Sequence, residues 1–175
     1  MKTTKRTLLT MVAAMLVIAM CFAMTACSGA KGSPEDVANA LMEATFEDFD
    51  AKAVVDLIHE DIRKVGFEKA DMDEDEIIEE MQEGLDETKE GMEEEDGSIE
   101  WEVDDVDDMS KDDIKKMNEN LEKEDLDIEV TDGKTVTVTL TAFEDGEEAG
   151  SFDMPIQVIE IDGDWYLANM EQVNF

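Results

Sequence analysis

The strongest constraint on the fold lies in the last third of the chain, where apolar and polar residues alternate. The run Thr135–Phe143 (TVTVTLTAF) places valine, leucine and alanine on one face and four threonines on the other. Alternation with a period of two is typical of a β-strand with one buried face. Any fold for this chain must therefore supply a layer that covers the apolar face of this strand.

Three Asp-Gly pairs separate four such alternating runs, and Asp-Gly is a strong signal for a hairpin turn. The runs are 126–130, 135–143, 152–158 and 165–170, and the pairs are Asp132-Gly133, Asp145-Gly146 and Asp162-Gly163. We therefore expect an antiparallel meander of four strands. Pro155 has no amide donor, so its strand should be at an edge or bulged at that point.

The residues before the meander show helical periodicity and helix-capping signals. Helices are predicted at about 34–48, from Asp50 through Ile58, at 73–94, and from Ser110 through Leu121, with a short strand at 98–103 and an ambiguous stretch at 60–67. The predicted fold class is α+β. We expect N-terminal helices packed on one face of a curved antiparallel sheet, which combines the C-terminal meander with the one earlier strand.

Residues 1–27 have the pattern of a bacterial export signal. A basic start is followed by the apolar run Leu8–Met24 and then by Thr25-Ala26-Cys27. This ending resembles the lipobox of bacterial lipoproteins, which implies cleavage before Cys27 and a lipid on its thiol. The protein would then be anchored to the cell membrane on its extracytoplasmic face. The alternative is an uncleaved transmembrane anchor, for which this run lies at the short limit of length.

Cleavage at this point would divide the chain into a signal peptide (1–26), a lipid anchor with a short tether (27–32) and a single α+β domain (33–175). Cys21 would leave with the signal peptide, so Cys27 would have no disulfide partner. All 49 acidic residues but only 11 of the 14 basic ones would remain, for a formal charge of −38. Such a charge disfavours nucleic acid and favours basic partners.

Three short stretches resemble the nuclear transport factor 2-like superfamily, and more narrowly the small bacterial lipoproteins that carry such domains. They are Ser33–Val37 (SPEDV) after the lipobox, the threonine-rich strand 135–143, and Ile159–Leu167 (IEIDGDWYL). The resemblance implies a cone-shaped α+β fold whose sheet and helices enclose a pocket. Some members of that superfamily are enzymes, and others bind ligands or partners.

Candidate pocket residues are His59, Trp101, Trp165 and Tyr166. A histidine beside carboxylates can act as a general base, although a histidine at a helix end is the commoner case. Aromatic residues at strand spacing belong more often to a core, but Trp165 and Tyr166 are adjacent and so should face opposite sides. No residue set indicates catalysis, a cofactor or a metal centre, and the spacing after Asp71, Asp73 and Asp75 excludes an EF-hand.

These features predict a lipid-anchored binding protein without catalytic activity. Its partner would be a small ligand, a peptide or another envelope protein. Two alternatives stay open. One is an enzyme of the cone-shaped fold that uses a pocket carboxylate or His59, and the other is a low-affinity binder of divalent cations through its acidic loops.

Overall fold

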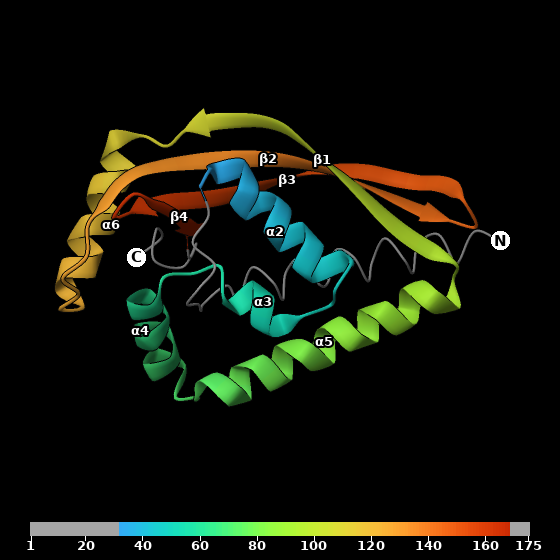
Figure 1. Cartoon of the computed structure of the whole chain (residues 1–175), viewed down its shortest axis with the longest axis horizontal. Helices are drawn as coiled ribbons and strands as arrows, with labels where there is room; N and C mark the ends of the chain where they lie inside the picture. The colour runs from blue at the N-terminus through green and yellow to red at the C-terminus, as the bar shows by residue number, and fades with distance from the viewer. Residues whose placement is uncertain (1–31, 169–175) are drawn as a thin grey trace.

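The computed structural model describes residues 32–168, and the export signal with Cys27, together with residues 169–175, lies outside them. The described residues form five helices and four strands in an α+β arrangement (Figure 1). In chain order the elements are α2 (Pro34–Phe46), α3 (Ala51–Val55), α4 (Glu60–Ala70), α5 (Glu74–Glu94), β1 (Gly97–Asp108), α6 (Lys111–Lys123), β2 (Val130–Glu144), β3 (Glu147–Ile161) and β4 (Asp164–Leu167).

The four strands form one antiparallel sheet in the order β1-β2-β3-β4, so each strand pairs with its neighbour in sequence. The sheet is long and twisted, and α2, α3, α4 and α5 lie on one side of it (Figure 1). Helix α2 packs against all four strands, whereas α5 contacts β1 and α6 contacts β2. The predicted α+β class, with helices covering one face of an antiparallel sheet, is confirmed.

Helix starts follow the capping signals in the sequence. The Ser33 hydroxyl accepts a hydrogen bond from the Asp36 amide at 3.2 Å, with Pro34 in the first turn of α2. Asp73 opens α5 with a reciprocal capping box to Glu76, and Ser110 caps α6. These caps satisfy amides that a helix cannot pair internally. The stretch left ambiguous by the sequence forms α4, which begins after His59.

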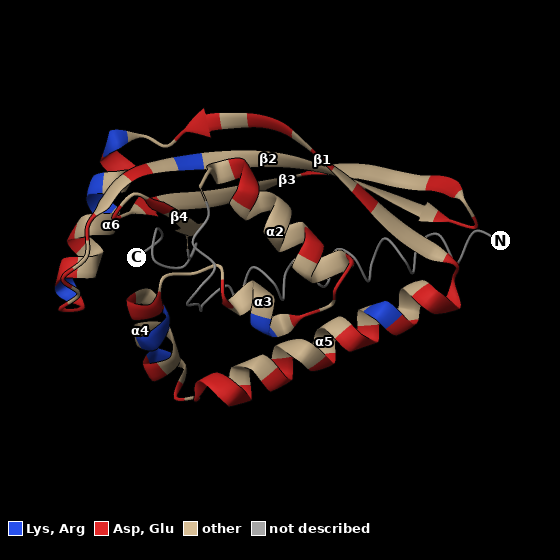
Figure 2. Cartoon of the chain, viewed as in Figure 1, with Lys and Arg blue, Asp and Glu red and all other residues tan. Residues whose placement is uncertain are grey.

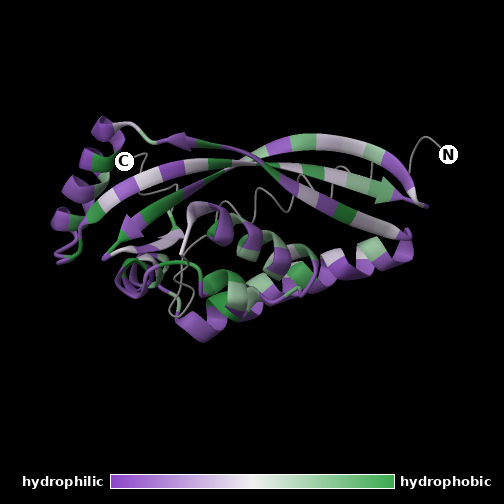
Figure 3. Cartoon of the chain, turned by 45° about the horizontal axis from the view of Figure 1, so that its top comes forward, coloured by the Kyte–Doolittle hydropathy of each residue, from purple (hydrophilic) through white to green (hydrophobic). Residues whose placement is uncertain are grey.

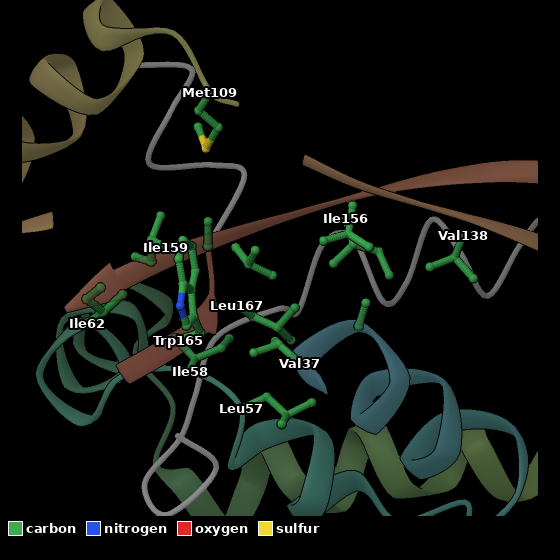
Figure 4. Close-up of a cluster of buried hydrophobic side chains, with 14 of the residues drawn as sticks. Val37, Leu57, Ile58, Ile62, Met109, Val138, Ile156, Ile159, Trp165 and Leu167 are labelled. Atoms are coloured by element: carbon green, nitrogen blue, oxygen red, sulfur yellow. The ribbon is translucent and has the colours of Figure 1, made fainter. Parts of the chain in front are cut away.

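One large hydrophobic core lies between the helices and the sheet. Its members come from α2, the α3–α4 connection, α4, the β1–α6 connection, α6, β2, β3 and β4 with the residue that follows it, and Figure 4 displays part of it. The labelled residues are Val37, Leu57, Ile58, Ile62, Met109, Val138, Ile156, Ile159, Trp165 and Leu167. A smaller cluster joins α2, α3 and α5 through Ala44, Ala51, Val54, Val55, Met81 and Leu85. Val136, Val138 and Leu140 of the alternating run thus point into the core.

The prediction of a hairpin turn at Asp132-Gly133 is wrong. Residues Val130–Glu144 form one continuous strand, and the register only shifts between Val130 and Asp132. Gly133 is buried at this irregularity, and a Cβ atom there would lie 2.7 Å from the Met109 sulfur. Gly133 therefore permits a close packing contact, and the meander has three strands rather than four.

The other two Asp-Gly pairs do form the hairpin turns. Asp145 and Gly146 join β2 to β3 with φ of 54° and 74°, and Asp162 and Gly163 join β3 to β4 with φ of 56° and 90°. Positive φ at both central residues is the requirement of a type I′ turn, which suits the twist of the paired strands. Neither Asp132 nor Gly133 has a positive φ.

Strand β1 is longer than its predicted range because a bulge interrupts its alternation. The register with β2 shifts between Val103 and Asp105, which leaves Asp104 as the extra residue. Pairing then continues to Asp108 opposite Lys134. A bulged residue breaks the period of two and increases the local twist. The acidic residues after Val103 therefore lack the sequence pattern of a strand, although they pair with β2 as one.

Pro155 lies in β3, which is an interior strand by order but an edge at this position. It pairs with Thr137 of β2 on one side. On the other side β4 reaches only to Leu167, which pairs with Val158. Among residues 32–168, the missing amide of Pro155 therefore removes no bond of the β3–β4 ladder, and Pro155 lies at an edge of the described sheet, as predicted.

Candidate binding surface

His59 ends the connection between α3 and α4 and caps α4. Its Nδ1 atom accepts a hydrogen bond from the Asp61 amide at 3.3 Å, and its side chain is 18% exposed. A nitrogen that accepts this bond carries no proton, so the cap places the proton of the neutral ring on Nε2. The helix-end reading of His59 is thus the one that the structure supports.

Tyr166 is the one other predicted pocket residue that meets His59. The two rings pack edge to face with centroids 5.1 Å apart. The backbone sets this contact, because the Leu167 amide donates to the Leu57 carbonyl at 2.8 Å and the Ala168 amide donates to the Gln157 carbonyl at 2.9 Å. These bonds hold β4 between β3 and the connection that carries His59.

The two tryptophans do not join this pair as a pocket. Trp165 is 9% exposed and belongs to the core, and Tyr166 beside it is partly buried and packs against the same core. Trp101 lies on β1 opposite Leu140, which pairs with Phe152 of β3. Tyr166 pairs with Ile159, seven residues further along β3, or about 23 Å at the usual strand rise.

Arg63 is a buried cation that the sequence analysis did not identify. It is 7% exposed, and its Nη1 atom lies 2.8 Å from Glu74 Oε1 at the start of α5 and 3.9 Å from Asp56 Oδ1. Its Nε atom has no hydrogen-bond partner among the described residues. Arg63 ties α4 to α5 and to the end of α3. No local pattern distinguishes it from Lys64 beside it, which is exposed.

No aspartate or glutamate among residues 32–168 is buried as a whole, although one carboxylate oxygen of Glu95 and one of Glu144 are buried without a hydrogen-bond partner there. Glu144 lies at the β2–β3 turn, at the opposite end of the sheet from Tyr166 and His59. The buried polar residues of the described chain are Thr45, Arg63 and Thr88. Residues 32–168 hold no group of three or more histidine, cysteine, aspartate or glutamate side chains placed to bind a metal ion. Neither alternative function therefore gains a site in the described part of the chain.

A broad polar surface lies on the sheet face opposite α2. Its centre is the threonine column of β2, and its flanks are residues of β1 and β3, all of them polar except Pro155, which the strand registers place in four rows. From the β2–β3 turn inward the rows are Glu100, Thr141 and Ser151; Glu102, Thr139 and Asp153; Asp105, Thr137 and Pro155; and Asp107, Thr135 and Gln157. We call these twelve residues the threonine face. Figure 3 shows the alternation of hydropathy along these strands.

Side chains of the threonine face interact mainly with one another. The Thr139 hydroxyl lies between two carboxylates, 2.9 Å from Asp153 Oδ1 and in contact with Asp104 of the bulge. The Thr141 and Ser151 hydroxyls are 3.4 Å apart. A hydroxyl donates a single proton, so Thr139 can satisfy only one of its two carboxylates at a time. The other carboxylate is left to water or to a cationic donor.

Basic residues are absent from the threonine face. No lysine or arginine occurs in β1 or anywhere after Lys134. Figure 2 shows the basic residues on α3, α4, α5 and α6 and at the start of β2, whereas β1 and the β2–β3 hairpin carry acidic residues. Most of these lysines form ion pairs away from the threonine face, as Lys52 does with Asp56 at 2.7 Å and Lys69 with Glu124 at 2.8 Å.

Lys134 marks the boundary of the acidic region. Its ammonium lies 2.6 Å from Asp108 and 2.8 Å from Asp132, and the hydrogen bonds that it donates to these carboxylates raise the pKa of Lys134. The same contact lowers the pKa of Asp132. The charge of Lys134 is thus neutralised by Asp108 and Asp132 at the end of β1. None of the described cations forms an ion pair with Glu100, Glu102, Asp105 or Asp107.

Comparison with protein-family models, with curated proteins and with solved structures gives no match to this chain. The likeness to the nuclear transport factor 2-like superfamily therefore stays a prediction. Among residues 32–168, no helix combines the length and apolar character needed to cross a bilayer.

Proposed function

We propose that this protein is a lipoprotein anchored through Cys27 on the extracytoplasmic face of the cell membrane, where it binds a partner without catalysing a reaction. The anchor rests on the basic start, the apolar run and the Thr25-Ala26-Cys27 ending of residues 1–27. The binding role rests on one observation, the threonine face, which is a polar sheet surface that no described helix packs across.

A catalytic role has less support. His59 is committed to the cap of α4 and to the ring of Tyr166, and the described residues place no buried carboxylate beside it. A general base must reach a substrate proton with its lone pair free. In His59 the lone pair of Nδ1 is used by the Asp61 amide, and Nε2 carries the proton. The neutral ring therefore has no nitrogen left to accept a substrate proton, which suits a structural role.

Chemical crosslinking in living cells tests the binding role. The wild-type protein should yield a discrete crosslinked species that contains one partner of defined mass. The Cys27→Ala variant, which should remain as unprocessed precursor without lipid, should yield less of it. A wild-type protein that gives no discrete species over a range of crosslinker lengths would contradict the binding role.

A further inference from the structure

We infer that the threonine face docks an extended, lysine- or arginine-rich segment of another protein. This inference rests on the proposed binding function and adds the surface and the chemistry of the partner. The occupant follows from charge complementarity, because the face carries carboxylates on two strands and no cation.

Edge protection alone does not explain this pattern. Charged side chains on an edge strand prevent pairing with another sheet, and either sign of charge serves that purpose. Here every charged residue of β1 is acidic, and Asp153 adds a further negative charge on the same face of β3. The bulge at Asp104 already guards the edge, because it breaks the regular register of β1.

The spacing of the carboxylates favours a polypeptide over a small cation. Glu100, Glu102, Asp105 and Asp107 follow one another along β1 on the same face, since the bulge absorbs the odd residue between 102 and 105. Their span is about 20 Å, and their pitch is about 7 Å at the usual strand rise. An extended peptide with a basic residue at every second position has the same pitch. A single metal ion can meet one or two of these carboxylates, not the row.

The threonine column completes the surface. Its hydroxyls can donate to and accept from the backbone of a segment lying across β2, and they carry no charge that would oppose a cation. The Thr139 hydroxyl can donate to only one of its two neighbouring carboxylates, Asp104 and Asp153, so the other is available to a cationic donor. Ion pairs on such an exposed surface are individually weak, so binding requires several of them together.

The test measures binding of a fluorescent peptide of alternating lysine and serine, about 12 residues long to cover the span of β1. The protein is purified in detergent from the membranes of the cells that make it. The triple variant Glu100→Gln, Glu102→Gln, Asp107→Asn removes three charges from the face. The control variant Glu79→Gln, Glu83→Gln, Glu87→Gln removes three exposed charges from α5.

The face triple should weaken the peptide at least about tenfold at about 150 mM salt, as expected for the loss of three exposed ion pairs, while the α5 triple stays within about twofold. Thr137→Lys, which adds a cation at the centre of the threonine face, should weaken binding of the peptide to a similar extent. All variants should melt cooperatively like the wild type. Equal weakening by both triples, or complete displacement of the peptide by calcium at about 1 mM, would overturn the inference.

The same triple in cells separates this inference from the proposed function. If the wild type captures a partner in the crosslinking experiment and the face triple does not, the binding function and the assignment of the threonine face are both supported. If the triple captures the same partner as efficiently as the wild type, the binding function holds and the assignment of the face fails.

Discussion

The imidazole of His59 meets the ring of Tyr166 edge to face, with the two ring planes inclined at 78°. The same imidazole accepts the hydrogen bond that starts α4. One side chain therefore joins the first turn of a helix to the last described strand. Both contacts are structural. Substitutions of His59 can separate the contribution of the helix cap from that of the contact with Tyr166.

Replacing His59 with alanine removes both the cap and the ring contact, and should lower the free energy of unfolding by about 1–2 kcal/mol. His59→Asn supplies a side-chain oxygen for the Asp61 amide and should recover about half of that loss. Urea denaturation followed by circular dichroism measures both. If asparagine is as destabilising as alanine, the cap contributes little.

Arg63→Ala should be more destabilising than Arg63→Met by about 2 kcal/mol. Methionine keeps the packed stem of the side chain and removes a buried Nε that lacks a described partner, whereas alanine leaves a void. Lys64→Met, an exposed neighbour, serves as the control and should change stability by less than about 0.5 kcal/mol. Equal losses for the two Arg63 variants would instead assign the stabilisation to the ion pair with Glu74.

Gly133→Ala should destabilise the protein by about 1–3 kcal/mol, because the added methyl group meets the Met109 sulfur. The cost should be smaller in a Met109→Ala background, where the space is open. A double-mutant cycle from thermal unfolding measures this coupling. Additive effects of the two substitutions would contradict the packing role of Gly133.

Lys134→Met should lower the melting temperature most at neutral pH. The pKa of Asp132 is lowered beside Lys134, so the contribution of this contact is present above the usual aspartate pKa and disappears as pH falls through the lowered value. The difference from wild type should therefore narrow below about pH 4. Lys111→Met changes the net charge equally, and the same pH profile for both variants would attribute the effect to net charge.

The sequence predicted the elements whose signals are local. The helix starts at about 34, at 73 and at Ser110 and the alternation at 135–143 depend on neighbouring residues, and all of them are confirmed. The Asp-Gly pairs show the limit of such signals. Two of them form turns, whereas at Asp132-Gly133 the strand continues, and Met109 occupies the space where a side chain on residue 133 would lie.

The threonine face was only half visible in the sequence. Alternation placed the four threonines on one side of a strand, but the acidic residues of β1 join them through a register that a bulge shifts. Long-range bonds escaped prediction for the same reason. The Asn118 side chain, for example, exchanges hydrogen bonds of 2.8 and 2.9 Å with the Val130 backbone and fastens α6 to β2. Contacts of this kind depend on the folded arrangement.

The most direct test of the proposed location and function is the intact mass of the protein purified from the membranes of its own cell. The result expected is a chain that begins at Cys27 and is heavier than its amino-acid sequence by an attached lipid. A mass equal to the full 19.6 kDa chain, with residues 1–26 retained and no lipid on Cys27, would contradict the anchor and the placement of the threonine face outside the cell.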